Sequence, residues 1–346
     1  MDNNDLIGPI VERLQTGDIP ADLRERVLLR IGQLKKMSES PSFLPEFDRL
    51  SRYVDWIVSL PWNKRTTDVL DLEHAKKVMD SEHFGLQQLK ERVLEYIAVM
   101  KLKGESQQNI ARAPILCFVG LVGTGKTTFA KSIAAVLGRK MARIPFGGMG
   151  DPLDLRGQSK SHPEAEPGKI IKALRTVQSK NPVILLDEID RVTDEGRASI
   201  MGVLVELLDP EQNQSFVDHY VDYPFDLSEA VFVATANNTT NVATAVMDRL
   251  EPLQMPSYTD QEKIMIAKQY LLPRALNAAG MKEDVISFDE AVWIQIVRPL
   301  GFDAGIRTLG RTVEGVVRKV AMQIAQGKIQ RIRLTPENVK QFLPTW

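Results

Sequence analysis

Hydrophobic side chains recur at helical spacing over roughly the first hundred residues. The segments 21–34 and 47–60 each place their apolar residues on one face, which predicts two amphipathic helices. The run MSESPSFLPEF between them is rich in Ser and Pro, and we expect it to form a loop. The pattern therefore predicts an N-terminal helical region, residues 1–84.

The period of the pattern changes near residue 112. Short apolar runs then alternate with helical stretches, and these runs are ILCFVG, ARIPF, VILLD and AVFVATA. Such alternation is typical of a doubly wound, largely parallel sheet with helices on its faces. We expect residues 85–250 to form this α/β domain.

A third pattern begins after Arg249, where we expect strands to stop and helices to return. Two capping boxes predict helix starts there, Thr259 with Glu262 and Ser287 with Glu290. The expected fold class is therefore α/β with α: N-terminal helices, a doubly wound parallel-sheet domain, and a C-terminal helical domain over residues 251–346.

Composition narrows the class of protein. Apolar and charged fractions of 43% and 26% are ordinary for a soluble globular chain, and a net charge of −1 gives no general attraction to nucleic acid or to an anionic membrane. The single cysteine, Cys117, excludes a disulfide framework and a Cys-based zinc site. The start MDNNDLIGP lacks the features of a signal peptide, and no apolar stretch is long enough to span a membrane, so we expect a cytoplasmic protein.

The strongest chemical signal is GLVGTGKT, residues 120–127, between an apolar run and a helical stretch. Its glycines let backbone N–H groups wrap around phosphate oxygens, Lys126 would neutralise the β- and γ-phosphates, and the Thr127 hydroxyl would ligate Mg²⁺. A chance match of the four fixed positions occurs in roughly one chain of this length in a hundred. The residues expected to bind ATP or ADP are Gly120, Gly123, Thr124, Gly125, Lys126, Thr127 and Thr128.

A second acidic element is needed for hydrolysis, and VILLDEID, residues 183–190, supplies it. Asp187 would hold Mg²⁺ through water, and Glu188 would polarise the attacking water as general base. Adjacent carboxylates at the end of an apolar strand are costly to bury without a cation. The alternative interpretation is a solvated strand end.

Two further polar residues complete this set. Asn237 follows the apolar run AVFVATA and could orient the attacking water, although Asn at a strand end is often only a turn former. Arg249 closes the α/β part and could reach the γ-phosphate of a neighbouring subunit. The alternative for Arg249 is an ordinary surface ion pair.

The segment RGQSKSHPEAEPGK, residues 156–169, poses a question of its own. It has no aromatic and no β-branched residue, yet it lies between segments that are expected to be buried strands. It is either a slack connection or a loop that reaches something outside its own domain.

Taken together, the sequences of these segments resemble the ATPase module of Lon-type ATP-dependent proteases, which belong to the AAA+ ATPases. The resemblance runs from about residue 10 to the last residue. It is carried by the segments FGLQQLKERVLEYIAV, PGKIIKAL, NPVILLDEID, ELLDPEQNQSFVDHY, DLSEAVFVATAN, MDRLE and SYTDQEKIMIAKQYLLP.

The resemblance implies roles for particular residues. It makes Asn237 the first sensor, Arg249 the arginine finger and Arg307 the second sensor on a helical lid, beside Lys126, Thr127, Asp187 and Glu188 in the roles given above. It places His83, Phe84 and Gly85 along the adenine pocket. It also implies a ring of six subunits that pulls unfolded polypeptides through its centre; the alternative for this chain by itself is a monomer.

Two departures from the family pattern stand out. The family typically carries an aromatic and an aliphatic residue on its first pore loop, where this chain has His162 and Pro163, and the second pore loop also differs at 193–199. The family continues into a protease domain with a Ser–Lys pair, whereas this sequence stops at LPTW. From this chain alone we therefore expect ATPase activity and no peptidase activity.

Three functional hypotheses follow. The first is an ATP-hydrolysing unfoldase and translocase module that uses Mg²⁺ and delivers unfolded proteins to a Lon protease domain in cis or in trans. The second is a nucleotide-gated oligomeric scaffold with weak translocation, favoured by the altered pore loops. The third is a nucleic-acid remodeller, which the neutral charge and the lack of a basic, aromatic-interleaved stripe disfavour.

Overall fold

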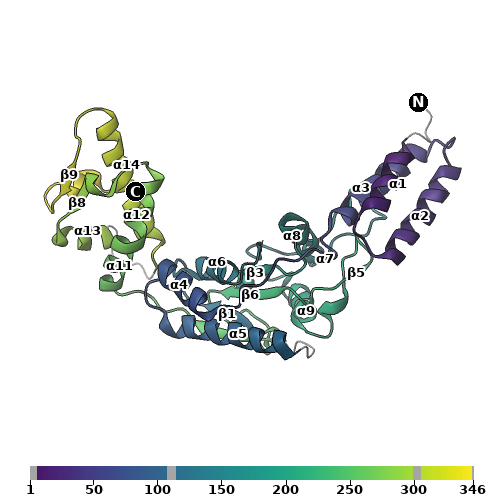
Figure 1. Cartoon of the computed structure of the whole chain (residues 1–346), viewed down its shortest axis with the longest axis horizontal. Coiled ribbons are helices and arrows are strands. Elements are labelled where there is room, and N and C mark those ends of the chain that lie inside the picture. Colours follow the sequence, from purple (N-terminus) through teal and green to yellow (C-terminus); the bar gives the residue numbers. More distant parts are fainter. Residues whose placement is uncertain (1–5, 107–113, 299–304, 345–346) are drawn as a thin grey trace. The chain divides into compact units, whose positions relative to one another are not determined.

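The computed structural model describes residues 6–106, 114–298 and 305–344, with the side chains of 103–106 left out (Figure 1). The chain forms two compact units, each built from non-contiguous segments. The first unit contains Met1–Asp71, Tyr96–Phe118 and Ile133–Pro252. The second unit contains Leu72–Glu95, Val119–Ser132 and Leu253–Trp346. The ranges 1–84, 85–250 and 251–346 remain proposed domain boundaries.

The N-terminal part of the first unit is helical, as the sequence pattern predicts. Its helices are α1 (Ile7–Thr16), α2 (Ala21–Lys36) and α3 (Phe43–Ser59). One correction concerns α3, which begins at Phe43 and so includes the last five residues of the expected loop, 43–47. Pro45 is tolerated because it stands in the first helical turn, where backbone N–H groups have no partner within the helix.

The predicted α/β sheet is also confirmed, and it has five strands. The strand order is β2-β3-β6-β1-β7, and β3 pairs in parallel with both β2 and β6. All residues of β3 and β6 are buried, as expected for central strands covered on both faces. The strands are β1 (Ile115–Val119), β2 (Met141–Pro145), β3 (Val183–Asp187), β6 (Val231–Ala236) and β7 (Leu250–Gln254).

The expectation that strands stop after Arg249 was wrong. Strand β7 follows that residue at once, and β8 (Ile286–Phe288) pairs in parallel with β9 (Ile332–Leu334) in the second unit. Ser287 therefore lies within a strand, and the capping box expected there does not form. The box of Thr259 and Glu262 does form, at the start of α11 (Asp260–Ile266). The three-residue strands are too short to show a period in the sequence.

The remaining elements complete the two units. The other helices are α4 (Leu72–Glu82), α5 (Gln87–Ser106), α6 (Lys126–Val136), α7 (Leu153–Arg156), α8 (Lys169–Val177), α9 (Arg197–Leu208), α10 (Thr244–Met247), α12 (Leu272–Ala278), α13 (Trp293–Val297), α14 (Arg307–Ala325) and α15 (Val339–Phe342). A hairpin of β4 (Phe216–Val217) and β5 (Pro224–Phe225) belongs to the first unit. Within the three described stretches, no helix combines the length and apolarity needed to cross a bilayer.

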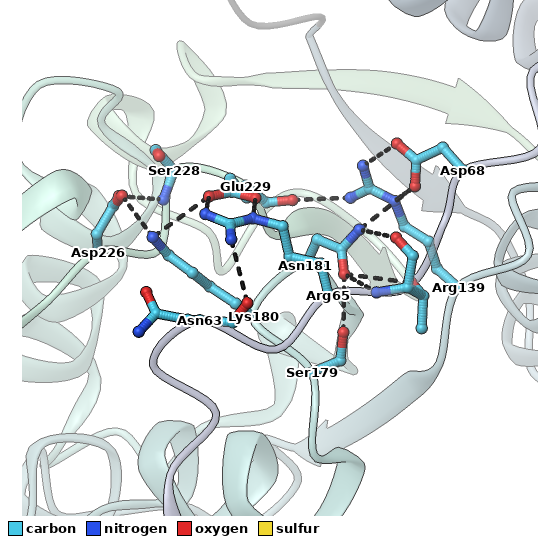
Figure 2. A network of polar contacts seen from close by, with 11 residues as sticks. Asn63, Arg65, Asp68, Arg139, Ser179, Lys180, Asn181, Asp226, Ser228 and Glu229 are labelled. Carbon is cyan, nitrogen blue, oxygen red and sulfur yellow. Dashed lines mark hydrogen bonds and ion pairs between the residues drawn. The ribbon is translucent and has the colours of Figure 1, made fainter. Parts of the chain in front are cut away.

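A polar network attaches the segment after α3 to the starts of two central strands (Figure 2). Arg65 pairs bidentately with Glu229, just before β6, at 2.5 and 2.7 Å. Arg139 pairs bidentately with Asp68 at 2.7 and 2.6 Å and also donates to the Glu229 carbonyl oxygen at 2.7 Å. Asn181, just before β3, bonds to the Thr66 backbone N–H, hydroxyl and carbonyl groups.

Lys180 completes this linker network, defined here as Arg65, Thr66, Asp68, Arg139, Lys180, Asn181, Asp226 and Glu229. Its ammonium lies 3.1 Å from Asp226 and 3.3 Å from Glu229. Three cations thus face three carboxylates, so the cluster is electrically balanced. The pKa of Glu229 is lowered, chiefly by its hydrogen bond with Arg65.

Candidate functional site

The phosphate loop lies in the second unit and has the backbone geometry that its glycines permit. Gly123 and Gly125 adopt φ of 84° and 99°, in a region that other residues rarely enter. A Cβ at Gly125 would meet no atom within 4 Å, so the space beside it is open. At Gly120 a Cβ would lie 2.6 Å from the Met255 carbonyl oxygen, which requires glycine there.

Lys126 begins α6 and folds back over the loop. Its ammonium donates to the carbonyl oxygens of Gly120 at 2.6 Å and Leu121 at 3.0 Å, and the side chain is largely buried. The charge is thereby held at the rim of the loop, beside the helix N-terminus where an anion is favoured. Thr127 is the next residue of the helix, as a Mg²⁺ ligand from this motif requires.

Other segments of the second unit fix the shape of the loop. The Ile306 N–H donates to the Gly123 carbonyl oxygen at 2.9 Å, and a Cβ on Gly305 would lie only 2.6 Å from the Gly123 carbonyl carbon. The Tyr258 hydroxyl donates to the Thr124 carbonyl oxygen at 3.3 Å. Arg307, exposed at the start of α14, therefore follows a segment in direct backbone contact with the phosphate loop.

A cavity of about 560 Å³ adjoins the loop within the second unit. Aromatic and aliphatic side chains supply much of its wall, which suits the faces of a purine ring. His83, Phe84, Gly125 and Thr128 line it, together with Tyr258, Ile266, Tyr270 and Leu271. Gly85 is not among the lining residues and instead forms a left-handed turn with φ 62°.

His83 forms a buried, uncharged part of this wall. Its Nε2 lies 2.7 Å from the Ser132 hydroxyl, and its ring lies against Phe129. Burial lowers the pKa of His83 to about 4, outweighing the opposing effect of Glu82. The Lys90 ammonium donates to the His83 carbonyl oxygen at 2.7 Å and fixes the turn after α4. The imidazole therefore stays neutral at physiological pH.

The acidic pair lies in the first unit, where β3 ends. Asp187 is buried, and its two carboxylate oxygens have different partners. The Thr235 hydroxyl donates to Oδ1 at 2.5 Å, and Arg143 on β2 donates to Oδ2 through Nε and Nη2, both at 2.6 Å. Arg143 is half exposed, so it supplies a positive charge from the solvent side.

Glu188 follows in an unusual backbone conformation. Its φ of 59° and ψ of 50° are left-handed, which is uncommon for a residue other than glycine. Its N–H donates to the Thr235 hydroxyl at 2.8 Å. Its side chain is 31% exposed, and the only ion pair described for it is with Arg191 at 3.6 Å. The carboxylate is thus accessible to a water molecule.

Asn237 is the first residue after β6 and is half-buried, so it stands at the same end of the sheet as Asp187 on the neighbouring strand. Arg249 follows α10, and its guanidinium donates to Asp209 Oδ2 and to the Ala245 carbonyl oxygen, each at 2.8 Å. The hydrogen bond from Arg249 to the Asp209 carboxylate is the main cause of the lowered pKa of Asp209. Within the described chain Arg249 therefore has an intramolecular partner.

The loop of residues 156–169 has a tightly built base in the first unit. A Cβ on Gly168 would lie 2.0 Å from the Leu155 carbonyl oxygen, and Gly157 has φ 76°. The buried Asp218 carboxylate accepts the Gly168 N–H at 2.7 Å and two further backbone N–H groups. Burial raises the pKa of Asp218 despite these bonds. The base of the loop is therefore held in a defined conformation by close packing and hydrogen bonds.

The tip of the same loop contacts helix α3. Arg52 donates to the Pro163 carbonyl oxygen at 3.1 Å, and the Lys160 ammonium lies 5.0 Å from the centre of the Tyr53 ring. Lys160 also pairs with Asp222 at 2.8 Å. The loop thus reaches the N-terminal helices, while His162 and Pro163 remain exposed beside a cavity of about 670 Å³.

Sequence reasoning missed two residues of the acidic site. Thr235 is a polar residue inside the apolar run VFVATA, and this interruption could have drawn attention to it. Arg143 alternates with buried positions on β2, which in a sequence indicates only a solvent-facing side chain. Its ion pair with Asp187 depends on how two strands pair, so no local signal could have revealed it.

The residues present fit a Mg²⁺–nucleotide substrate better than a metal held by protein alone. Among the described side chains, no group of three or more His, Cys, Asp or Glu could hold a metal ion. Mg²⁺ typically keeps several waters and binds one or two protein oxygens plus substrate phosphates. The expected ligand Thr127 lies in the second unit and Asp187 in the first.

Comparison with known families matches two regions of the chain. Residues 116–257 match the family described as ATPase family associated with various cellular activities (AAA). Residues 277–332 match the Lon protease AAA+ ATPase lid domain. The two matches cover the phosphate loop, the acidic pair and the helix α14 that begins at Arg307.

Curated relatives extend the similarity over nearly the whole chain. The Lon protease of Halothermothrix orenii is 42% identical over 326 residues, which is 94% of this chain and 41% of the relative. Lon protease 2 of Thermus thermophilus is 41% identical over 338 residues, 96% of this chain and 42% of the relative. The chain thus spans about two fifths of the length of these relatives.

Proposed function

Because the chain combines an AAA ATPase region with a Lon-type lid, we propose that it binds ATP with Mg²⁺ and hydrolyses it. The observation that supports turnover most directly is Glu188, which is held in a left-handed turn beside Asp187 with its carboxylate open to solvent. A protein that only bound nucleotide would have no need of a general base held in this way.

The second unit contains the groups that we expect to bind the nucleotide. In the second unit, the backbone N–H groups of residues 120–125 and the Lys126 ammonium bind the triphosphate, and the cavity beside His83 and Phe84 takes the base. Arg307 reaches the phosphates from the start of α14. The neutral His83 keeps the wall of the base pocket uncharged.

In the first unit, the chain supplies the groups for the chemical step. Glu188 accepts a proton from the attacking water as its oxygen forms a bond to the γ-phosphorus and the bond to the ADP oxygen breaks. Asn237 orients that water, and Asp187 holds the metal through water ligands. Bound Mg²⁺ would neutralise charge on the phosphate oxygens. Arg249 acts on a neighbouring subunit and must exchange its Asp209 partner to do so.

We propose further that hydrolysis moves unfolded protein toward a Lon-type protease domain, in a cytoplasmic oligomer that is six-membered in the family. The loop carrying His162 and Pro163 is the candidate for substrate contact. Its built base and its anchor on α3 support a positioned loop rather than an idle connection.

Two measurements test this proposal. The first is steady-state ATP hydrolysis with Mg²⁺, with and without casein, and the second is the particle mass from light scattering. We expect hydrolysis by an oligomer and stimulation by casein, with Lys126→Ala losing nucleotide binding. Hydrolysis that ignores casein would favour the nucleotide-gated scaffold, which the missing pore-loop aromatic supports. No hydrolysis by any assembled form would contradict the proposed function. A gel shift with DNA at low salt tests the remaining, disfavoured class.

A further inference from the structure

We propose that Thr235 is a positioning residue that holds the two acidic residues of the hydrolysis site in their working geometry. The inference rests on the proposed function. It begins from one buried hydroxyl that bonds to both residues: Thr235 Oγ1 donates to Asp187 Oδ1 at 2.5 Å and accepts the Glu188 N–H at 2.8 Å. Thr235 itself does not carry out the chemistry.

The bond to Glu188 acts on the backbone where it is most needed. Glu188 adopts a left-handed conformation, which non-glycine residues keep only when surrounding groups enforce it. The Glu188 side chain at this turn is partly exposed, whereas the residues of β3 before it are all buried. Loss of the Thr235 acceptor would leave the Glu188 N–H without its described partner and weaken the turn that aims the general base.

The bond to Asp187 acts on the side chain. Arg143 holds Oδ2 from the exposed side, and Thr235 holds Oδ1 from the buried side, so the carboxylate plane has a defined orientation. Without the hydroxyl, Oδ1 would lose the hydrogen bond that holds it from the buried side. The carboxylate could then rotate, and its water-mediated hold on the metal would weaken.

The hydroxyl of Thr235 can be removed without breaking the pairing of the strands in the sheet. The strand β6 pairs with β3 through backbone groups, with Val233 opposite Leu185 and Ala234 opposite Leu186. Thr235 is fully buried, and valine has nearly the same shape without the hydroxyl. A Thr235→Val variant therefore removes the two hydrogen bonds while it keeps the volume.

The test compares Thr235→Val and Thr235→Ser with wild type and with Glu188→Gln, using ATP turnover, KM for ATP and dependence on Mg²⁺. We expect Thr235→Val to lower kcat at least tenfold, to change the KM for ATP by less than about twofold, and to raise the Mg²⁺ concentration for half-maximal rate. Thr235→Ser, which keeps the hydroxyl, should restore kcat to within about threefold of wild type.

Thr312→Val is the matched control. Thr312 is also fully buried, but its hydroxyl donates to the Thr308 carbonyl oxygen within α14. We expect this variant to keep kcat within about twofold of wild type. If Thr235→Val fails to fold, by circular dichroism and thermal unfolding, Thr235→Ala against Thr235→Ser gives the same contrast.

The outcomes separate the inference from the proposed function. A folded Thr235→Val protein with wild-type kcat, or a Thr235→Ser protein as slow as Thr235→Val, overturns the role of Thr235 while leaving ATP hydrolysis intact. Wild-type protein without any hydrolysis overturns the proposed function, and the role of Thr235 with it. In the Glu188→Gln background, Thr235→Val should lower kcat by less than it does in wild type, because the general base is already absent and only the hold on Asp187 is left to lose; a further loss as large as that in wild type would contradict the role of Thr235 in positioning Glu188.

Discussion

Two polar clusters lie at opposite ends of the strands β3 and β6. The linker network gathers around Asn181 and Glu229, just before these strands begin (Figure 2). The acidic site gathers around Asp187 and Thr235, where the same strands end. Both clusters are rich in short hydrogen bonds, yet their charges are arranged differently.

In the linker network, each of the three carboxylates has a cation of the chain within 3.3 Å. Such a cluster holds segments together and leaves little for a ligand to bind. In the acidic site, Glu188 has only a distant ion pair and an accessible carboxylate. A complete set of partners thus marks a structural cluster, whereas a carboxylate that is held in place without a close cation marks a candidate site for chemistry.

The largest expected effect comes from the unsatisfied carboxylate. Glu188→Gln should lower kcat by about 10²–10⁴-fold, because the amide cannot accept the proton of the attacking water. ATP binding, measured as nucleotide-dependent thermal stabilisation, should be retained. If turnover persists near the wild-type rate, the general base is another residue and the contrast between the clusters fails.

The opposite result is expected from the linker network. Arg139→Ala should lower the free energy of unfolding by about 3 kcal/mol, because the nearly buried guanidinium bonds to Asp68 and to the Glu229 backbone. Urea unfolding measures the loss, and kcat of the folded variant should be unchanged. Arg331→Ala removes an exposed pair with Asp284 and should change stability by less than about 1 kcal/mol. Equal losses in both variants would contradict the structural role.

The base pocket provides a pH-dependent prediction. The pKa of His83 is lowered from 6.5 to about 4, so between these values the unfolded chain binds a proton that the folded chain does not. The contribution of His83 to stability is therefore fully present above pH 6.5 and is lost as the pH falls toward 4, by up to about 3 kcal/mol. Urea unfolding of wild type against His83→Gln should show the difference.

In that series the exposed His162, changed to Gln, serves as the control and should follow the wild-type curve. If the free energy of unfolding of wild type and of His83→Gln changes equally with pH across this range, the His83 ring is not held neutral by burial.

The smallest effect is expected at the tip of the loop 156–169. Arg52→Ala removes one hydrogen bond to the Pro163 carbonyl oxygen and should lower stability by less than about 1 kcal/mol. Hydrogen exchange of the amides in 159–165 should become severalfold faster, because the anchor on α3 is lost. Lys36→Ala, an exposed change on α2, should leave this exchange unaltered. Unchanged exchange in the Arg52 variant would mean that the tip is held by its other contacts.

Much of the fold followed from local pattern. The run VILLD predicted β3 because a short apolar segment that ends in carboxylates matches a buried strand, and the phosphate loop predicted the start of α6. The pattern failed at Ser287, where a capping motif was overridden by pairing of β8 with a strand more than forty residues away. It also failed at Phe43, where a proline in the first helical turn resembled a loop.

The sequence by itself identified the candidate chemical groups: GLVGTGKT, the pair Asp187 and Glu188, and the glycine-bounded loop at 156–169. Their meaning depends on residue type and spacing within a few positions, which a folded environment does not alter. Only the tertiary structure decided that Thr235 bridges Asp187 and Glu188, that Arg139 secures the linker, and that Arg52 anchors the loop. These partners are 47 or more residues apart and meet because packing of the sheet and helices brings their backbones together, so no local pattern encodes them.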